Sequence, residues 1–133
     1  MSLSVDIAHR LGSFDLNVAF EAPAGVTALF GRSGSGKTSV VNAVAGLMRP
    51  TSGRIALNGD VLFDAKTGPE QPPHRRHLGY VFQEARLFPH LSVRKNLAYG
   101  QRFARPGAER PDLKTIADLL DITPLLDRRP GTL

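Results

Sequence analysis

The sequence has 133 residues, a net charge of +5 and no cysteine. Its length suits one domain and its 41% hydrophobic content suits a globular core. The absence of cysteine excludes disulfides and thiolate metal sites. The sequence contains no apolar run near the roughly 20 residues of a membrane span and no signal peptide, so we expect a location in the cytosol or on the cytosolic face of a membrane.

The first elements predicted along the chain are strands. Residues 3–8 and 14–20 alternate apolar and polar side chains, as in half-buried strands, and the turn at Gly12-Ser13 makes them an antiparallel hairpin. Val26 to Phe30 is short, mostly apolar and β-prone, which predicts a strand buried on both faces.

A glycine-rich loop, Gly31 to Gly36, separates this strand from a predicted helix over Lys37 to Leu47, in which Gly46 is a weak point and after which Pro50 ends the helix. Asn58-Gly59-Asp60 then predicts a second hairpin between strands at 54–57 and 61–63.

The rest of the chain predicts one more strand and two helices. The strand covers Leu78 to Phe82, and the helices cover Ser92 to Tyr99 and Asp112 to Leu120, with Ser92 and Asp112 as N-caps. Residues 105–111 read as a flexible connection.

The strongest chemical signal is the segment 31–38, which matches the phosphate-loop pattern G-x-x-x-x-G-K-[ST] between a strand and a helix. Glycine permits backbone angles that other residues avoid, which we expect of Gly31, Gly34 and Gly36. Successive N–H groups and the helix N-terminus then face an anion. Lys37 would bind the β- and γ-phosphates, and Thr38 would bind Mg²⁺. The predicted nucleotide contacts are Gly31, Arg32, Ser33, Gly34, Ser35, Gly36, Lys37, Thr38 and Ser39.

ATPases, GTPases and small-molecule kinases all carry this loop. The sequence contains no N-K-x-D segment, which a GTPase needs to read guanine, and no identifiable lid or acceptor site of a kinase.

The segment Gly79-Tyr80-Val81-Phe82-Gln83 and its continuation to Val93 resemble the Q-loop region of ABC transporter ATPases. Residues 45–55, with Ala-Gly-Leu and Pro-Thr-Ser-Gly, are similar to the stretch that follows the phosphate loop in the same family. The resemblance implies an α/β P-loop NTPase fold, with a RecA-like core and an antiparallel β subdomain, and it implies ATP and Mg²⁺ as cofactors. Residues 1–82 would form the β subdomain and core, and 83–133 the Q-loop and the start of the helical subdomain.

The family resemblance also implies roles for single residues. Gln83 would contact the Mg²⁺ and attacking-water region, so that Gln83 and Lys37 are the predicted catalytic residues and Thr38 and Gln83 the predicted metal contacts. Phe14 is the candidate for stacking on adenine, although a core role is equally open and His9 or Arg10 could substitute. Phe88-Pro89-His90 either covers the domain's own core or receives a short helix of a membrane subunit.

Within that family, residues 83–90, 93–100 and 122–131 most resemble the ATP-binding subunits of molybdate importers. The resemblance implies transmembrane permease partners bound through the Gln83–Leu91 region, a homodimer of ATPase subunits, and a peripheral position on the cytoplasmic face of the inner membrane. ATPases of sulfate, iron or sugar importers, and a non-hydrolysing nucleotide-binding module, remain alternatives. The basic residues come in small groups such as Arg75-Arg76 and Arg128-Arg129, which indicates solvated surface charge facing phospholipid or anionic ligands, so we expect no nucleic-acid partner.

The family pattern implies that the signature motif begins at Leu133, so that the chain stops before the signature, the strand ending in Asp-Glu and the switch histidine. We therefore expect hydrolysis from the full-length protein and none from this segment alone. A strand at Val26–Phe30 would then have an unpaired edge, which predicts poor stability for the isolated segment.

Overall fold

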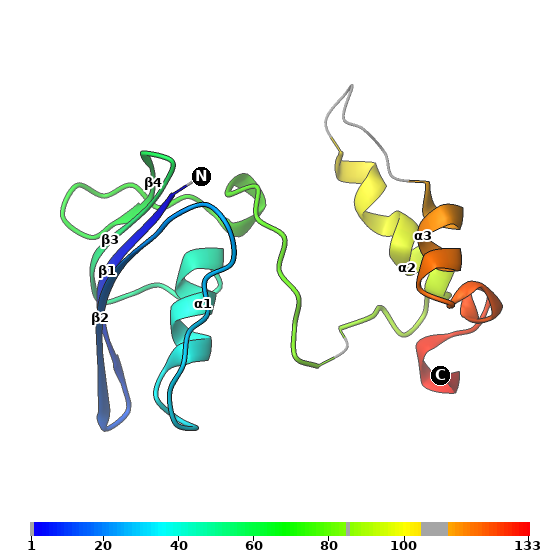
Figure 1. Ribbon diagram of the computed structural model, residues 1–133, viewed down its shortest axis with the longest axis horizontal. Coiled ribbons are helices and arrows are strands. Elements are labelled where there is room, and N and C mark those ends of the chain that lie inside the picture. The colour runs from blue at the N-terminus through cyan, green and yellow to red at the C-terminus, as the bar shows by residue number, and fades with distance from the viewer. Residues whose placement is uncertain (1, 85, 105–111) are drawn as a thin grey trace. The chain divides into compact units, whose positions relative to one another are not determined.

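A computed structural model describes residues 2–84, 86–104 and 112–133. The chain divides into two compact units, Met1–Tyr80 and Val81–Leu133, which are described separately here (Figure 1). The predicted connection at 105–111 lies outside the described residues. Within those residues, no helix combines the length and the apolar character of a membrane span.

The first unit is built on a four-stranded antiparallel sheet with the order β2-β1-β3-β4. Both predicted hairpins are confirmed, because β1 pairs with β2 and β3 pairs with β4. The second turn has Asn58 at φ 53° and Gly59 at φ 89°, the left-handed angles of a tight two-residue hairpin. The strands are β1 (Leu3–Leu11), β2 (Phe14–Ala22), β3 (Ser52–Leu57) and β4 (Asp60–Asp64).

One helix, α1 (Lys37–Ala45), packs against this sheet (Figure 1). Ala43 is fully buried and joins a core whose other buried members all come from the strands. Burying apolar surface stabilises a fold by about 0.8 kcal/mol per methylene-sized group, so the small Ala43 contact contributes to holding α1 against the sheet. The strand residues in the core are Val5, Ile7, Ile55, Leu62 and Phe63.

Two predicted strands are wrong. Neither Val26–Phe30 nor Leu78–Phe82 forms a strand, and the side chains of Val26 and Phe30 are 101% and 93% exposed. A strand exists only through hydrogen bonds to a neighbouring strand, and the four strands of the described chain pair with one another instead. We expected residues 26–30 to form a strand with an unpaired edge. They have no regular secondary structure and are exposed instead.

The end of α1 also differs from the prediction. The helix ends at Ala45, and Gly46 is its C-cap, with φ 78° in the left-handed region. Arg76, predicted as part of a surface pair, is only 5% exposed. Its Nη1 donates to the carbonyl oxygens of Ala43 (2.7 Å) and Val44 (2.8 Å), and its Nε donates to that of Gln71 (2.7 Å).

The guanidinium of Arg76 is thus a buried cation at the C-terminal end of a helix, where the macrodipole favours positive charge. Burial lowers the pKa of Arg76, but an arginine remains charged at neutral pH. The guanidinium of Arg76 therefore gains hydrogen-bond acceptors in the buried interior, and the last carbonyl oxygens of α1 gain a donor. A Cβ on Gly46 would lie 2.7 Å from Nε of Arg76, so this contact also requires glycine at the cap.

The second unit consists of short helices. The predicted helices are confirmed as α2 (Val93–Tyr99) and α3 (Leu113–Leu119), with Ser92 and Asp112 as their N-caps. The unit also has the 3-10 turns η2 (Gly100–Phe103), η3 (Thr123–Leu125) and η4 (Pro130–Thr132), while the first unit has η1 (Pro73–Arg75). A small core of Val93, Ala117 and Leu126 joins them.

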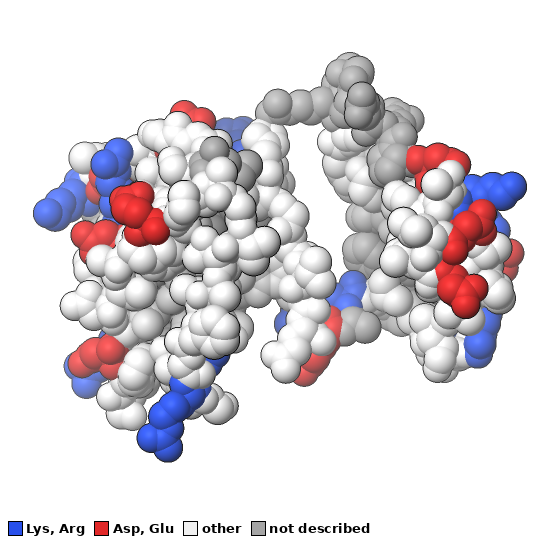
Figure 2. All heavy atoms as spheres, viewed as in Figure 1, with Lys and Arg blue, Asp and Glu red and all other residues white. Residues whose placement is uncertain are grey.

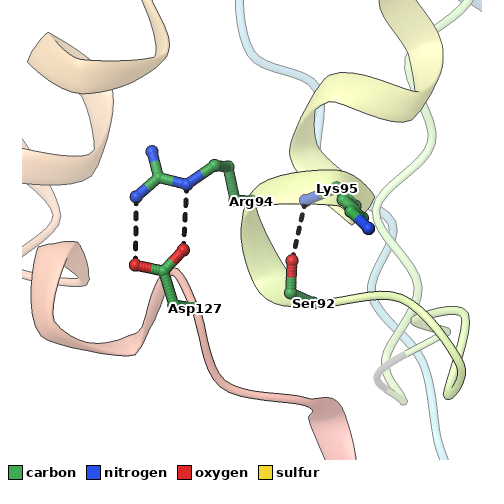
Figure 3. Close-up of polar contacts among 4 residues, drawn as sticks. All are labelled: Ser92, Arg94, Lys95 and Asp127. Atoms are coloured by element: carbon green, nitrogen blue, oxygen red, sulfur yellow. Dashed lines mark hydrogen bonds and ion pairs between the residues drawn. The ribbon is translucent and has the colours of Figure 1, made fainter.

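The start of α2 is tied to the end of the chain. The N–H groups of Val93 and Arg94 donate to the carbonyl oxygens of Arg128 (2.9 Å) and Leu126 (2.8 Å). The Arg94 guanidinium also binds both carboxylate oxygens of Asp127, at 3.0 and 3.3 Å (Figure 3). This ion pair lowers the pKa of Asp127, through the hydrogen bonds first and the charge second. The helix N-terminus thereby gains partners that its own backbone cannot supply.

Replacing Arg76 by leucine should lower the free energy of unfolding by about 3 kcal/mol, because buried carbonyl oxygens lose a charged donor. Arg75→Leu is the matched control, since Arg75 is exposed in the same turn, and it should change stability by less than about 0.5 kcal/mol. Chemical denaturation of the full-length protein measures both. Equal effects of the two substitutions would show that the Arg76 contacts do not stabilise the fold.

Candidate phosphate-binding site

The loop before α1 has glycine at three positions, under two different constraints. Gly34 and Gly36 have φ angles of 81° and 86°, as predicted from the pattern. Gly31 does not have a positive φ, so the reason given for it was wrong. A Cβ there would lie 2.6 Å from the Ser35 Oγ, so a larger residue at this position would force the Ser35 side chain to move.

Lys37 is the first residue of α1, and its ammonium group lies inside the curve of the loop. Its Nζ donates to the carbonyl oxygens of Gly31 and Arg32, each at 2.8 Å, and to the Ser35 Oγ at 3.3 Å. The positive charge is therefore held by the backbone of the loop itself. A phosphate entering the loop would meet this ammonium group directly, and the side chain is partly buried.

The N-terminus of α1 has no side-chain cap. Gly36 is the N-cap residue, and the first bond of the helix runs from the Val40 N–H to the Gly36 carbonyl oxygen at 3.0 Å. The N–H groups of Lys37, Thr38 and Ser39 therefore have no partner within the helix. Unpaired N–H groups, the helix dipole and an adjacent ammonium group together favour an anion.

Phe14 and Leu16, on β2, lie against this loop. A Cβ on Gly36 would come within 2.7 Å of the Leu16 Cδ1 and 3.4 Å of the Phe14 Cε1. Leu16 is buried, whereas Phe14 is 42% exposed and keeps part of its ring open beside the loop. The structure thus brings Phe14 together with the loop residues. Of the two substitutes considered for it, His9 binds the Thr51 hydroxyl at 3.0 Å and Arg10 pairs with Asp15 at 3.8 Å.

Gln83 belongs to a different unit from the loop, so its distance from the loop is not described. It is exposed and belongs to the second unit, three residues after Tyr80, the last residue of the first unit. The Tyr80 hydroxyl donates to the Oδ1 of Asn42 on α1 at 2.7 Å. The chain that leads to Gln83 is therefore fastened to the helix that begins with Lys37, a contact that the sequence pattern did not predict.

The residues present fit Mg²⁺ only together with a bound phosphate. No group of three or more His, Asp or Glu side chains able to hold a metal occurs in residues 2–84, 86–104 and 112–133. Mg²⁺ demands six oxygen ligands in octahedral geometry and usually takes them from one or two protein groups, waters and phosphates. The exposed Thr38 hydroxyl suits such a site as a single protein ligand.

A second surface lies in the other unit, where the Phe88 ring packs on Tyr99 with the ring centres 4.5 Å apart. Phe88 is 41% exposed, so it covers part of its own unit and also faces outward. Both alternatives considered for Phe88-Pro89-His90 therefore stay open. Acidic and basic side chains are mixed over most of the visible surface of each unit, while a group of basic side chains stands alone at the lower end of the first unit (Figure 2).

A glycine-rich loop, an uncapped helix N-terminus and an inward-facing lysine define a P-loop protein. The sequence matches the ABC transporter family over residues 15–133, and the chain belongs to that family. Membership implies nucleotide binding.

The chain is similar to two proteins named "Molybdenum import ATP-binding protein ModC". It is 56% identical to that of Rhizobium meliloti, covering 100% of this chain and 37% of the relative. It is 58% identical to that of Paramagnetospirillum magneticum, covering 98% and 36%. The chain thus spans little more than a third of the length of these relatives.

Solved structures agree on the fold. An ATP-binding cassette dimer in a post-hydrolysis state, bound to ADP and phosphate, matches with a TM-score of 0.68 at 20% identity, covering 100% of this chain and 63% of that one. A bacterial Atm1-family ABC exporter with ATP bound matches with a TM-score of 0.69 at 27% identity, covering 98% and 22%. The predicted fold class, an α/β P-loop NTPase with an antiparallel sheet, is confirmed.

Gly36→Ala should destabilise the protein by about 1 kcal/mol more than Gly34→Ala. Both substitutions force alanine into a left-handed φ, which costs about 1–2 kcal/mol. Only the substitution at Gly36 also meets a neighbour, the buried Leu16, because nothing lies within 4 Å of a Cβ on Gly34. Denaturant titration of the two variants measures the difference, and equal free energies of unfolding would contradict the Gly36–Leu16 contact.

Proposed function

We propose that this chain is the N-terminal part of the nucleotide-binding subunit of an ABC importer for molybdate. In this proposal, the full-length protein couples the binding and hydrolysis of ATP to oxyanion uptake. The observation that carries it is the identity of 53–58% to proteins named for molybdenum import, extending over 98–100% of the chain. The loop geometry gives this family assignment a chemical basis.

Each residue of the loop has a proposed part in holding Mg²⁺-ATP. The N–H groups of residues 33–39 would bind phosphate oxygens, and Lys37 would neutralise the β- and γ-phosphates. Its Nζ would exchange two carbonyl partners for phosphate, which is favourable because both groups are charged. The hydroxyl of Thr38 would complete the shell of Mg²⁺.

Adenine would stack on Phe14. The partly exposed Phe14 ring lies beside Gly36, which supports this role. When the phosphates of a nucleotide occupy the loop, the attached base must lie close to the loop, within reach of an aromatic ring. Gln83 would sense the γ-phosphate and Mg²⁺. Its neutral amide can donate and accept, so it can contact metal-bound water without adding charge. Residues 1–82 would belong to the core and β subdomain, and 83–133 would begin the helical subdomain.

The partners in this proposal are a second copy of the full-length subunit and the membrane permease subunits. The permeases would bind the Gln83–Leu91 region, where Leu87 and Phe88 are each about 40% exposed. The protein would therefore be peripheral, on the cytoplasmic face of the inner membrane. ATPases of sulfate, iron or sugar importers have the same phosphate chemistry, so the substrate needs its own test.

The test is uptake by cells that lack this gene and receive the full-length protein. We expect the wild type to restore molybdate uptake, and Lys37→Ala to reduce it by about 100-fold or more because phosphate charge loses its fixed counter-charge. Lys66→Ala, in an exposed loop of the same unit, is the control and should restore uptake fully.

Restored uptake of sulfate without molybdate would show that the substrate is wrong while the ATPase role stands. Full activity of Lys37→Ala would show that the phosphate role of the loop is wrong.

A further inference from the structure

The loop that precedes α2 is organised by a single side chain, Asn96. Its Oδ1 accepts from the Phe88 N–H at 2.8 Å. Its Nδ2 donates to the carbonyl oxygens of Phe88 (3.2 Å), Leu91 (3.2 Å) and Ser92 (3.1 Å). One half-buried amide on α2 therefore binds both ends of the loop 88–92.

This loop has little else to give it shape. Within it, the Leu91 N–H donates to the Phe88 carbonyl oxygen at 3.1 Å, which closes a turn over Pro89 and His90. The Phe88 carbonyl oxygen also accepts from the Nδ2 of Asn96, so the hydrogen bond that closes the turn and the hydrogen bond from Asn96 share this oxygen. The Phe88 ring is then set against Tyr99 of α2, where it stays partly exposed.

A hollow of about 320 Å³ opens beside the loop. The loop supplies one wall, and α2 and η2 supply the other, so the position of the loop determines whether the hollow exists. The lining residues are His90, Leu91, Lys95, Ala98, Tyr99 and Arg102.

We propose that Asn96 is a positioning residue for coupling, whose amide holds the loop 88–92 in the shape that the membrane permease binds. This inference rests on the proposed function, because it needs a permease that docks on the Gln83–Leu91 region. The inference adds Asn96, which lies outside that region on α2, the helix that follows it in the chain. The amide is suited to the task because it offers one acceptor and two donors to a backbone that presents both.

The charge state of an aspartate at this position provides the sharpest test. Asn96→Asp keeps the shape and the acceptor for the Phe88 N–H, but at neutral pH its carboxylate faces three carbonyl oxygens and cannot donate. Protonation restores a donor, and an environment of carbonyl oxygens favours the protonated form. Asn96→Ala removes both functions at every pH.

Binding of the full-length protein to its permease, reconstituted in lipid nanodiscs, is measured between about pH 8 and about pH 5.5. At the upper pH, both variants should bind at least about tenfold more weakly than the wild type. At the lower pH, Asn96→Asp should recover at least about threefold relative to Asn96→Ala. Both variants keep His90, Lys95 and the Arg94–Asp127 pair of the same unit, so any effect of pH on these groups cancels in the comparison.

ATP affinity and thermal melting separate this role from general destabilisation. Unchanged ATP binding with weakened permease binding supports the proposal, and Lys114→Ala, exposed on α3, should behave as the wild type. Wild-type affinity in both Asn96 variants, a parallel loss of ATP binding, or no recovery of Asn96→Asp at low pH would each overturn it. If the wild type itself binds no permease, the proposed function fails instead.

Discussion

The packing of α1 against the antiparallel sheet is the constraint on which the candidate site depends. The phosphate loop has few contacts of its own, and its shape follows from where the helix begins. Ala43 anchors the helix in the core, Leu16 lies against Gly36 at its start, and Arg76 binds its last carbonyl oxygens. A helix held at both ends presents its N-terminal N–H groups in a fixed direction, as an anion site requires.

The same helix connects the loop to the rest of the chain. Asn42, five residues after Lys37, binds Tyr80 just before the chain enters the second unit. In the proposed function, Gln83 reports the γ-phosphate to a permease, and its position is then limited by this anchor. The polar contacts of Arg76, Tyr80 and Asn96 have one feature in common, because each fixes a segment without regular structure to a helix.

Sequence predicted best what short-range chemistry determines. The Asn58-Gly59 turn and the Ser92 and Asp112 caps need only neighbouring residues, and all three are confirmed. The strands expected at 26–30 and 78–82 are wrong because strand formation needs a hydrogen-bonded partner strand. An apolar run in the sequence does not show which strand that partner would be. Arg76 was interpreted as surface charge, since nothing local shows that a carbonyl 33 residues away will meet it. The loop residues of the candidate site were predictable because their pattern is local, whereas the contact between Tyr80 and Asn42 joins residues 38 apart and was not.

The central claim is that the Gly31–Thr38 loop holds the phosphates of ATP. The most direct test is a crystal structure of the full-length protein with Mg²⁺ and a non-hydrolysable ATP analogue. We expect phosphate oxygens within hydrogen-bonding distance of the loop N–H groups, and Nζ of Lys37 on phosphate instead of on the carbonyl oxygens of Gly31 and Arg32. Phosphates bound elsewhere, with Lys37 still on those carbonyl oxygens, would contradict the account.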